Sequence, residues 1–162
     1  GPRKGQDVAL DELREMATLW EQGAREMARA GSLVPAACRP RFRREFVLGQ
    51  HLAYTWRSAA HVEEFLRLRD TILEFSRQPW VRSGHARENL RDLARMRAIA
   101  VAEREISRKD LVLVSGVEFL DLALRLDMGT SSTEAIMKAK IRQVDELLQS
   151  ELPRWKTRLL QW

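Results

Sequence analysis

The C-terminal part of the chain carries an apolar pattern that is typical of an α-helix. Apolar side chains recur there in steps of three and four over nearly four heptads, which places them on one helical face. Pro153 lies inside the pattern and lacks an amide hydrogen, so we expect the helix to kink or restart near Ser150. The stripe consists of Met137, Ile141, Val144, Leu148, Leu152, Trp155, Leu159 and Trp162.

The first half of the chain repeats this periodicity in two segments. One helix is expected from Val8, with Asp7 as its N-cap, to Ala30, where a glycine follows. A second is expected from Arg41, after a loop with two prolines, and its apolar stripe changes face near Ser58. This change indicates either one long bent helix or two helices, the second capped by Ser58; we favour the single helix.

Further helices are expected between the second helix and the last one. A segment with apolar residues at Leu90, Leu93, Ile99 and Ile106 has helical spacing. We also predict a largely buried helix over 109–127, in which Gly116 marks the close approach of a neighbouring backbone. Ser131 and Glu134 have the spacing of a capping box, which predicts the start of the last helix.

These patterns together predict an all-α fold, an antiparallel bundle of four to six helices with one or two long bent helices. Gly1-Pro2 is typical of a cleaved purification tag, so we assign residues 1–5 to a tag scar and frayed terminus, and 6–162 to a single helical-bundle domain. No apolar run approaches the roughly 20 residues of a membrane span. The longest candidate, 111–126, is interrupted by charged residues.

The sequence contains no recognisable catalytic or metal-binding motif. Cys38 is the only cysteine, which excludes an intrachain disulfide and fits a reducing compartment, so we expect a cytoplasmic protein. The histidines lack metal-ligand spacing; His61 and Glu64, one helical turn apart, would need further ligands. We therefore predict no catalytic residues, no metal and no cofactor, and an enzymatic role is left open but not favoured.

Positive charge is concentrated in one region. Residues 39–97 contain 13 arginines and 7 acidic residues, within a chain of net charge +5. Arg41, Arg43 and Arg44 lie near the start of the second helix. Two readings stay open: the arginines bind phosphate groups of a nucleic acid, or they form a solvated face that nearby acids such as Glu88 and Asp92 neutralise. The second arginine group consists of Arg87, Arg91 and Arg95, spaced by one helical turn each.

The end of the last helix is a second candidate binding surface. Trp155, Leu159 and Trp162 continue its apolar stripe to the chain terminus. The stripe either packs against the first helix or docks a partner protein by helix-in-groove contact.

The C-terminal segment also resembles a known family. Lys140-Ile141, followed by residues 152–156, Leu-Pro-Arg-Trp-Lys, is similar to the closing motif of the bacterial toxic anion (tellurite) resistance family, and 103–106 with 110–111 and 10–31 can be aligned loosely with its helices. The chain departs from the family pattern at 119–127, where a Gln-rich stretch is expected, and at Leu152, where the family has isoleucine. The resemblance implies a cytoplasmic, non-enzymatic helical protein acting with stress-resistance partners.

Two functional hypotheses follow. The first is a non-catalytic helical interaction module, an adaptor or subunit that binds another macromolecule, with a protein as the expected partner. The alternative is a basic, nucleic-acid-binding helical subunit of a ribonucleoprotein or DNA-associated complex. Both hypotheses allow a homo-oligomer.

Overall fold

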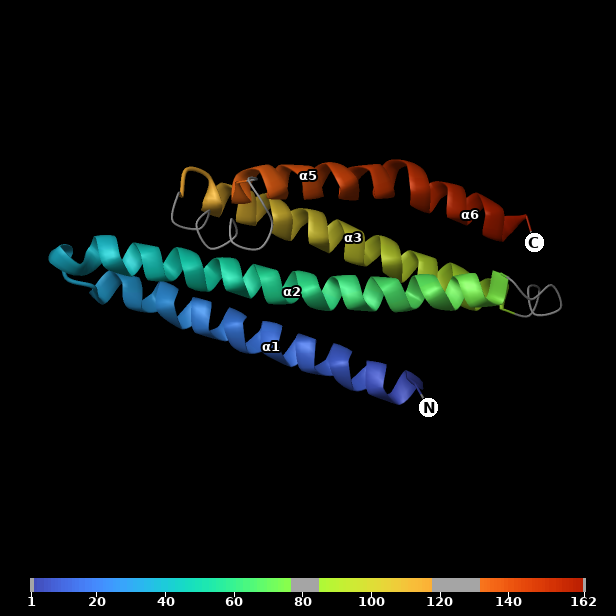
Figure 1. Ribbon diagram of the computed structural model, residues 1–162, viewed down its shortest axis with the longest axis horizontal. Helices are drawn as coiled ribbons and strands as arrows, with labels where there is room; N and C mark the ends of the chain where they lie inside the picture. Colours follow the sequence, from blue (N-terminus) through green and yellow to red (C-terminus); the bar gives the residue numbers. More distant parts are fainter. Residues whose placement is uncertain (1, 77–84, 118–131, 162) are drawn as a thin grey trace.

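The computed structural model describes residues 2–76, 85–117 and 132–161 and confirms the all-α prediction. Four long helical rods lie side by side, and the described residues contain no strand (Figure 1). The elements are α1 (Pro2–Ala30), two short 3-10 turns (Gly31–Leu33 and Ala36–Cys38), α2 (Arg39–Ser76), α3 (Ala86–Val114), α5 (Thr133–Glu146), a π-helical turn (Leu147–Glu151) and α6 (Leu152–Leu160).

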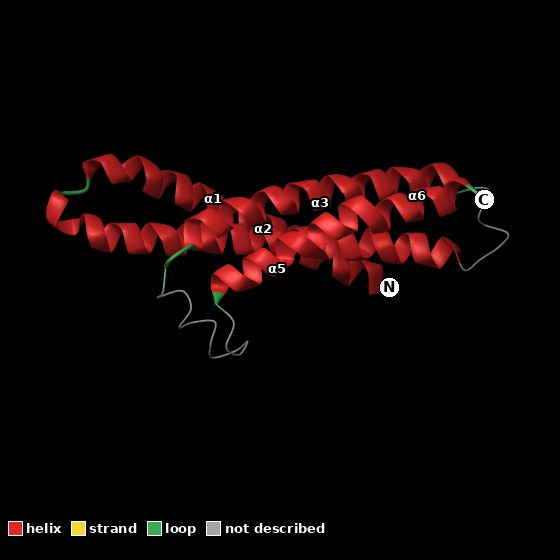
Figure 2. Cartoon of the chain, turned by 90° about the horizontal axis from the view of Figure 1, so that it is seen from above, coloured by secondary structure: helices red, strands yellow, loops and turns green. Residues whose placement is uncertain are grey.

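The rods pack in chain order. α1 packs chiefly on α2, α2 on α3, and α3 on both α5 and α6, so α2 and α3 occupy the middle of the molecule. The turn that joins α1 to α2 projects beyond the ends of α3 and α5 in both views (Figures 1 and 2). This turn carries Cys38, whose side chain is exposed.

α1 and α2 meet along a seam of alanines. Ala17 and Ala24 of α1 and Ala53 and Ala60 of α2 are all buried, and within each helix the two lie one heptad apart. Small side chains at these positions allow the two backbones to approach closely. The predicted start of the first helix at Val8 is wrong, because α1 already begins at Pro2 and Asp7 lies inside it rather than at its N-cap.

α2 is a single helix, as we favoured. The change of face near Ser58 occurs because different sides of α2 meet different neighbours: the alanine seam meets α1, whereas Phe65 and Ile72 pack into a cluster with α3 and α6. Ser58 does not cap a helix, since its hydroxyl accepts a hydrogen bond from Lys140 of α5.

α5, the π-helical turn and α6 together form the last rod. Two buried apolar clusters hold α2, α3 and this last rod together. The smaller contains Val47 and Val114, with Met137 packed against it. The larger consists of Ile72, Leu93, Met96, Ala100, Leu152 and Leu159, with partly buried side chains such as Phe65, Leu68, Val144 and Trp155 around it. The two clusters lie towards opposite ends of α3, and the stretch between them is polar.

The predicted start of a separate helix at Lys109 is wrong. α3 runs unbroken past Lys109 and ends at Val114, because Gly116 adopts a φ of 73°, a left-handed conformation that suits glycine. A Cβ atom at Gly116 would meet no described atom within 4 Å, so this glycine ends the helix and marks no close approach of a described backbone segment. The rest of that predicted helix, 118–127, lies outside the described residues.

The last rod begins one residue later than predicted. Ser132 is the N-cap of α5, and its hydroxyl oxygen accepts a hydrogen bond from the Ala135 amide. The capping box proposed for Ser131 is therefore wrong, and Ser131 itself lies outside the described residues. Glu134, in the first turn, instead accepts hydrogen bonds from Ser115 and Lys138.

The predicted interruption near Ser150 is confirmed as a π-helical turn that ends two residues before Pro153. Val144 and Leu152 are eight residues apart, which in an α-helix would rotate Leu152 by roughly 80° relative to Val144. A π turn accommodates one extra residue. Leu152 and Leu159 consequently face the same core as Val144.

Candidate functional site

The middle of α3 places polar side chains on the face that elsewhere forms the core. Glu103, Ser107 and Asp110 are buried, and their spacing continues the steps of three and four that lead from Met96 to Val114. They face α2 and α5 between the two apolar clusters. We call these three residues, with the side chains that contact them, the polar band.

Glu103 is the centre of one half of the polar band. Its carboxylate accepts a hydrogen bond from His61 Nδ1 of α2 at 2.7 Å and pairs with the Lys140 ammonium of α5. Lys140 also donates to Ser58 Oγ at 2.6 Å. Burial opposes ionisation of Glu103, but His61 and Lys140 outweigh it and lower the Glu103 pKa to about 2. One carboxylate thus joins three helices.

Asp110 forms the other half of the polar band. His51 Nδ1 of α2 lies 2.9 and 3.0 Å from the two carboxylate oxygens of Asp110. An ionised carboxylate can only accept, so Nδ1 carries the hydrogen in this pair. Both side chains are largely buried, which makes the pair a second polar link between α2 and α3.

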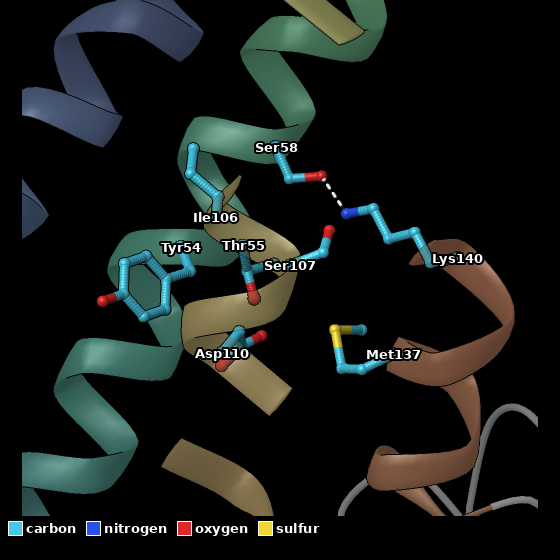
Figure 3. Close-up of a pocket in the computed structure, with 8 residues that line it drawn as sticks. All are labelled: Tyr54, Thr55, Ser58, Ile106, Ser107, Asp110, Met137 and Lys140. Atoms are coloured by element: carbon cyan, nitrogen blue, oxygen red, sulfur yellow. Dashed lines mark hydrogen bonds between the residues drawn. The ribbon is translucent and has the colours of Figure 1, made fainter. Parts of the chain in front are cut away.

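A cavity of about 110 Å³ lies between these two halves (Figure 3). Ser107 and Asp110 reach it from α3 and Lys140 from α5, while Tyr54, Thr55 and Ser58 line it from α2. The volume has room for several water molecules. Ser107 Oγ is fully buried and has no hydrogen-bond partner among the described residues.

The polar band does not form a catalytic constellation in the described part of the chain. The Ser107 hydroxyl contacts neither imidazole, so it has no adjacent base to activate it. The structure also corrects the pairing considered for His61, which bonds Glu103 on α3 and not Glu64. No group of three or more metal-ligating side chains occurs among the residues that the structure describes.

The apolar end of the last rod is mostly used inside the protein. Leu159 is 4% exposed within the larger cluster, and Trp155 packs against that cluster. The rod packs on α3, not on the first helix as considered from sequence. Trp162 lies outside the described residues. In this arrangement Leu159 is not available to a partner, and Trp155 only in part.

The six candidate arginines divide into two groups at opposite ends of α2. Arg41, Arg43 and Arg44 lie by the projecting α1–α2 turn, are exposed, and pair with no described acidic residue. Arg44 is 32 residues from the far end of α2, which corresponds to roughly 50 Å along the helix. The second group lies at that far end, at the start of α3.

Only one of the three arginines in the second group forms an ion pair with a described residue. Arg87 and Arg91 are exposed and unpaired among the described residues, whereas Arg95 donates to Glu64 of α2 at 2.6 Å. Glu64 also pairs with Arg14 of α1 at 3.0 Å, so this contact links three helices. The expected local pairs are absent: Glu88 contacts His85 instead of Arg91, and Arg95 pairs with Glu64 instead of Asp92.

α2 has a third apolar face in addition to those that meet α1 and α3. Its members follow steps of four and three, and none is buried or belongs to either apolar cluster. Leu48, Val62 and Leu73 are 39%, 48% and 36% exposed. We call this face the outer stripe; it consists of Leu48, Leu52, Thr55, Ala59, Val62, Leu66, Arg69 and Leu73.

The comparable exposed positions of α3 are mostly charged, as on an ordinary solvated helix face. They include Arg87, Arg91, Glu105, Arg108 and Lys109. The outer stripe therefore differs from the exposed face of α3, whereas α1 also exposes apolar side chains, Val8, Met16 and Leu19, at 56%, 39% and 56%. The outer stripe was missed from sequence because α2 has apolar residues on three faces, and a search for one apolar stripe blends them.

No family model, curated protein or solved structure matches the chain. The resemblance to the toxic anion resistance family accordingly stays a prediction. Within the described ranges, no helix combines the length and the apolar character needed to cross a lipid bilayer.

Proposed function

We propose that the protein is a non-catalytic helical interaction module that binds another protein along the outer stripe of α2. The support is the outer stripe itself: leucine and valine side chains at heptad spacing, more than a third exposed at Leu48 and Val62, on a helix that two neighbours already hold in place. Clustered exposed apolar side chains of this kind mark interaction surfaces. The proposal replaces Trp155, Leu159 and Trp162 as the principal contact residues and includes the cytoplasmic location expected from the single cysteine.

The shape of the stripe favours a helix as the bound element. From Leu48 to Leu73 the stripe spans 25 residues, or roughly 38 Å of helix. A straight row of side chains in steps of three and four is complementary to a partner helix with the same repeat.

The experiment uses the full chain and a fluorescein-labelled amphipathic peptide of about 26 residues, with leucine at heptad positions and an uncharged polar face. We expect anisotropy to report saturable binding, and Val62→Glu to weaken it at least about tenfold, because a charge would enter an apolar contact. Val112→Glu is the matched control, since Val112 is 80% exposed on α3. Equal binding by the Val62 variant, or by a scrambled peptide without the repeat, would contradict the proposal.

A second candidate function is binding of nucleic acid by the arginines, and one observation favours it. Arg41, Arg43 and Arg44 are exposed, form no ion pair with a described residue, and lie in the first turns of α2, next to the projecting α1–α2 turn. A gel shift with single-stranded and duplex oligonucleotides over a salt series tests this function. Binding that weakens steeply with salt and is lost in a triple glutamate variant would support it, and absence of binding at low salt would exclude it.

A further inference from the structure

The face of α2 that carries the outer stripe continues beyond Leu48 towards the N-terminus of the helix. Arg44 precedes Leu48 by four residues and Arg41 precedes it by seven, so both extend the same helical face towards the start of α2. Arg43, between them, points about 140° away from Leu48 around the helix. The apolar stripe and two of the three exposed arginines thus form one continuous surface.

Arg41 and Arg44 form no ion pair with a described residue, and the one acid near them on this side of α2, the exposed Glu45, leaves a net positive charge at this end of the surface. Both arginines lie near the N-terminus of α2, where the helix dipole adds positive potential. A partner that covers the outer stripe would bring its own end beside these two guanidinium groups. Basic side chains there would be repelled, and acidic ones would form charge-assisted hydrogen bonds.

We infer that the partner's binding element is an amphipathic helix with acidic residues at the end that lies beside Arg41 and Arg44. This inference rests on the proposed function and adds the partner's charge to it. A second copy of this chain fits less well, because acids towards the far end of the stripe, Glu63 and Asp70, are already paired with Arg67 and Arg69 at 2.9 and 2.8 Å, and the chain has a net charge of +5.

Three labelled peptides with the same apolar repeat test the inference. They carry glutamate, glutamine or lysine in their terminal heptad, and each is made with that heptad at either end so that both directions of binding are sampled. We expect one glutamate peptide to bind the full chain at least about fivefold more tightly than its glutamine counterpart near physiological salt, and lysine to weaken binding.

Arginine variants locate the contact. Arg44→Glu should weaken binding of the preferred glutamate peptide by about fivefold or more and improve binding of the lysine peptide. Arg43→Glu is the matched control: it makes the same change of charge one residue away but on a different face, and we expect less than about a twofold effect.

The outcomes separate the two proposals. If the glutamine peptide binds and Val62→Glu abolishes that binding, but peptide charge and Arg44→Glu have no effect, the acidic partner is excluded while the interaction module stands. If no peptide binds, both proposals fail. A chain that forms a stable dimer, which Val62→Glu dissociates, would identify a second copy as the occupant and overturn the inference. Oligonucleotide binding that Arg43→Glu and Arg44→Glu weaken equally, and that Val62→Glu leaves unchanged, would favour the nucleic-acid function instead.

Discussion

Individual polar residues decide how the centre of this protein is held together. Glu103 is buried, yet its pKa is lowered to about 2 because the hydrogen bond from His61 and the charge of Lys140 outweigh the cost of burial. A carboxylate in this state contributes to folding only while it is ionised. Its contribution should therefore depend on pH in a way that neighbouring exposed carboxylates do not.

The sign of this dependence follows from the two pKa values. The Glu103 pKa falls from an unfolded value of 4.5 to about 2, so its stabilisation is complete above about pH 5 and is lost as the pH falls towards 2. The upper limit is about 3 kcal/mol. We expect urea denaturation of Glu103→Gln to show lower stability at pH 7 and a weaker decline towards pH 2 than the unmodified chain. Glu105→Gln, at an exposed position two residues further along α3, is the control, and parallel pH profiles for the Glu103 variant and the unmodified chain would contradict the assignment.

Ser107 gives a second prediction at this scale. A buried hydroxyl without a partner costs about 1–3 kcal/mol, although water in the adjoining cavity can reduce that cost. Ser107→Ala should therefore leave the free energy of unfolding unchanged or raise it by up to about 1 kcal/mol. A loss of more than about 1 kcal/mol would mean that a partner in the cavity engages the hydroxyl.

At the scale of elements, the π-helical turn is the irregularity with the clearest structural effect, because it brings Leu152 into register with Val144. The turn accommodates one extra residue, so removing one residue from it should restore an α-helix without rotating α6. We expect deletion of the exposed Gln149 together with Pro153→Ala, which removes the proline that opposes a continuous α-helix, to change the free energy of unfolding by less than about 1 kcal/mol.

Deletion of Lys156 is the contrasting experiment. Lys156 is also exposed, but it lies between Leu152 and Leu159, where no extra residue is available. Its loss would turn Leu159 out of the larger cluster by about 100° and cost about 2–4 kcal/mol. Equal effects of the two deletions in thermal denaturation would contradict this view of the turn.

The elements also show what periodicity can and cannot predict. The stripe of the last rod, the unbroken α2 and the interruption before Pro153 could be predicted because each depends on local spacing or on proline geometry. The polar band was missed because we divided α3 near Lys109, which separated Asp110 and Val114 from the register of Glu103 and Ser107. Continuing the heptads across that point would have placed Glu103, Ser107 and Asp110 on the buried face. Their partners His51 and His61 are 59 and 42 residues away along the chain, and no local pattern predicts such pairs.

At the scale of the whole molecule, the helices differ in how many neighbours they pack against. α3 packs against α2, α5 and α6, whereas α1 packs chiefly against α2. α1 relies on the alanine seam, on one larger buried side chain, Leu10, and on ion pairs such as Arg57 with Glu21, at 2.7 and 2.8 Å. Small side chains bury little apolar area, so the backbone amides of α1 should be the least protected from hydrogen exchange among the long helices.

Hydrogen exchange followed by mass spectrometry can test this order. Amides in the middle of α1 should exchange at least about tenfold faster than those around Met96 in α3, because opening of α1 leaves both apolar clusters intact. Ala17→Leu should increase exchange in α1 more than in α3, since a larger side chain in the seam separates α1 from α2. Uniform protection of all four rods would show that they unfold as one unit.

The exposed thiol of Cys38 makes the molecule convenient for optical work. As the sole cysteine, sited on the projecting turn just before Arg39, it permits attachment of one dye at a known position without prior mutagenesis. A fluorophore there would sit within a few residues of Arg41 and Arg44 and far along α2 from Leu73. Energy transfer to an acceptor placed at one or the other end of a bound peptide would then reveal in which direction that peptide runs.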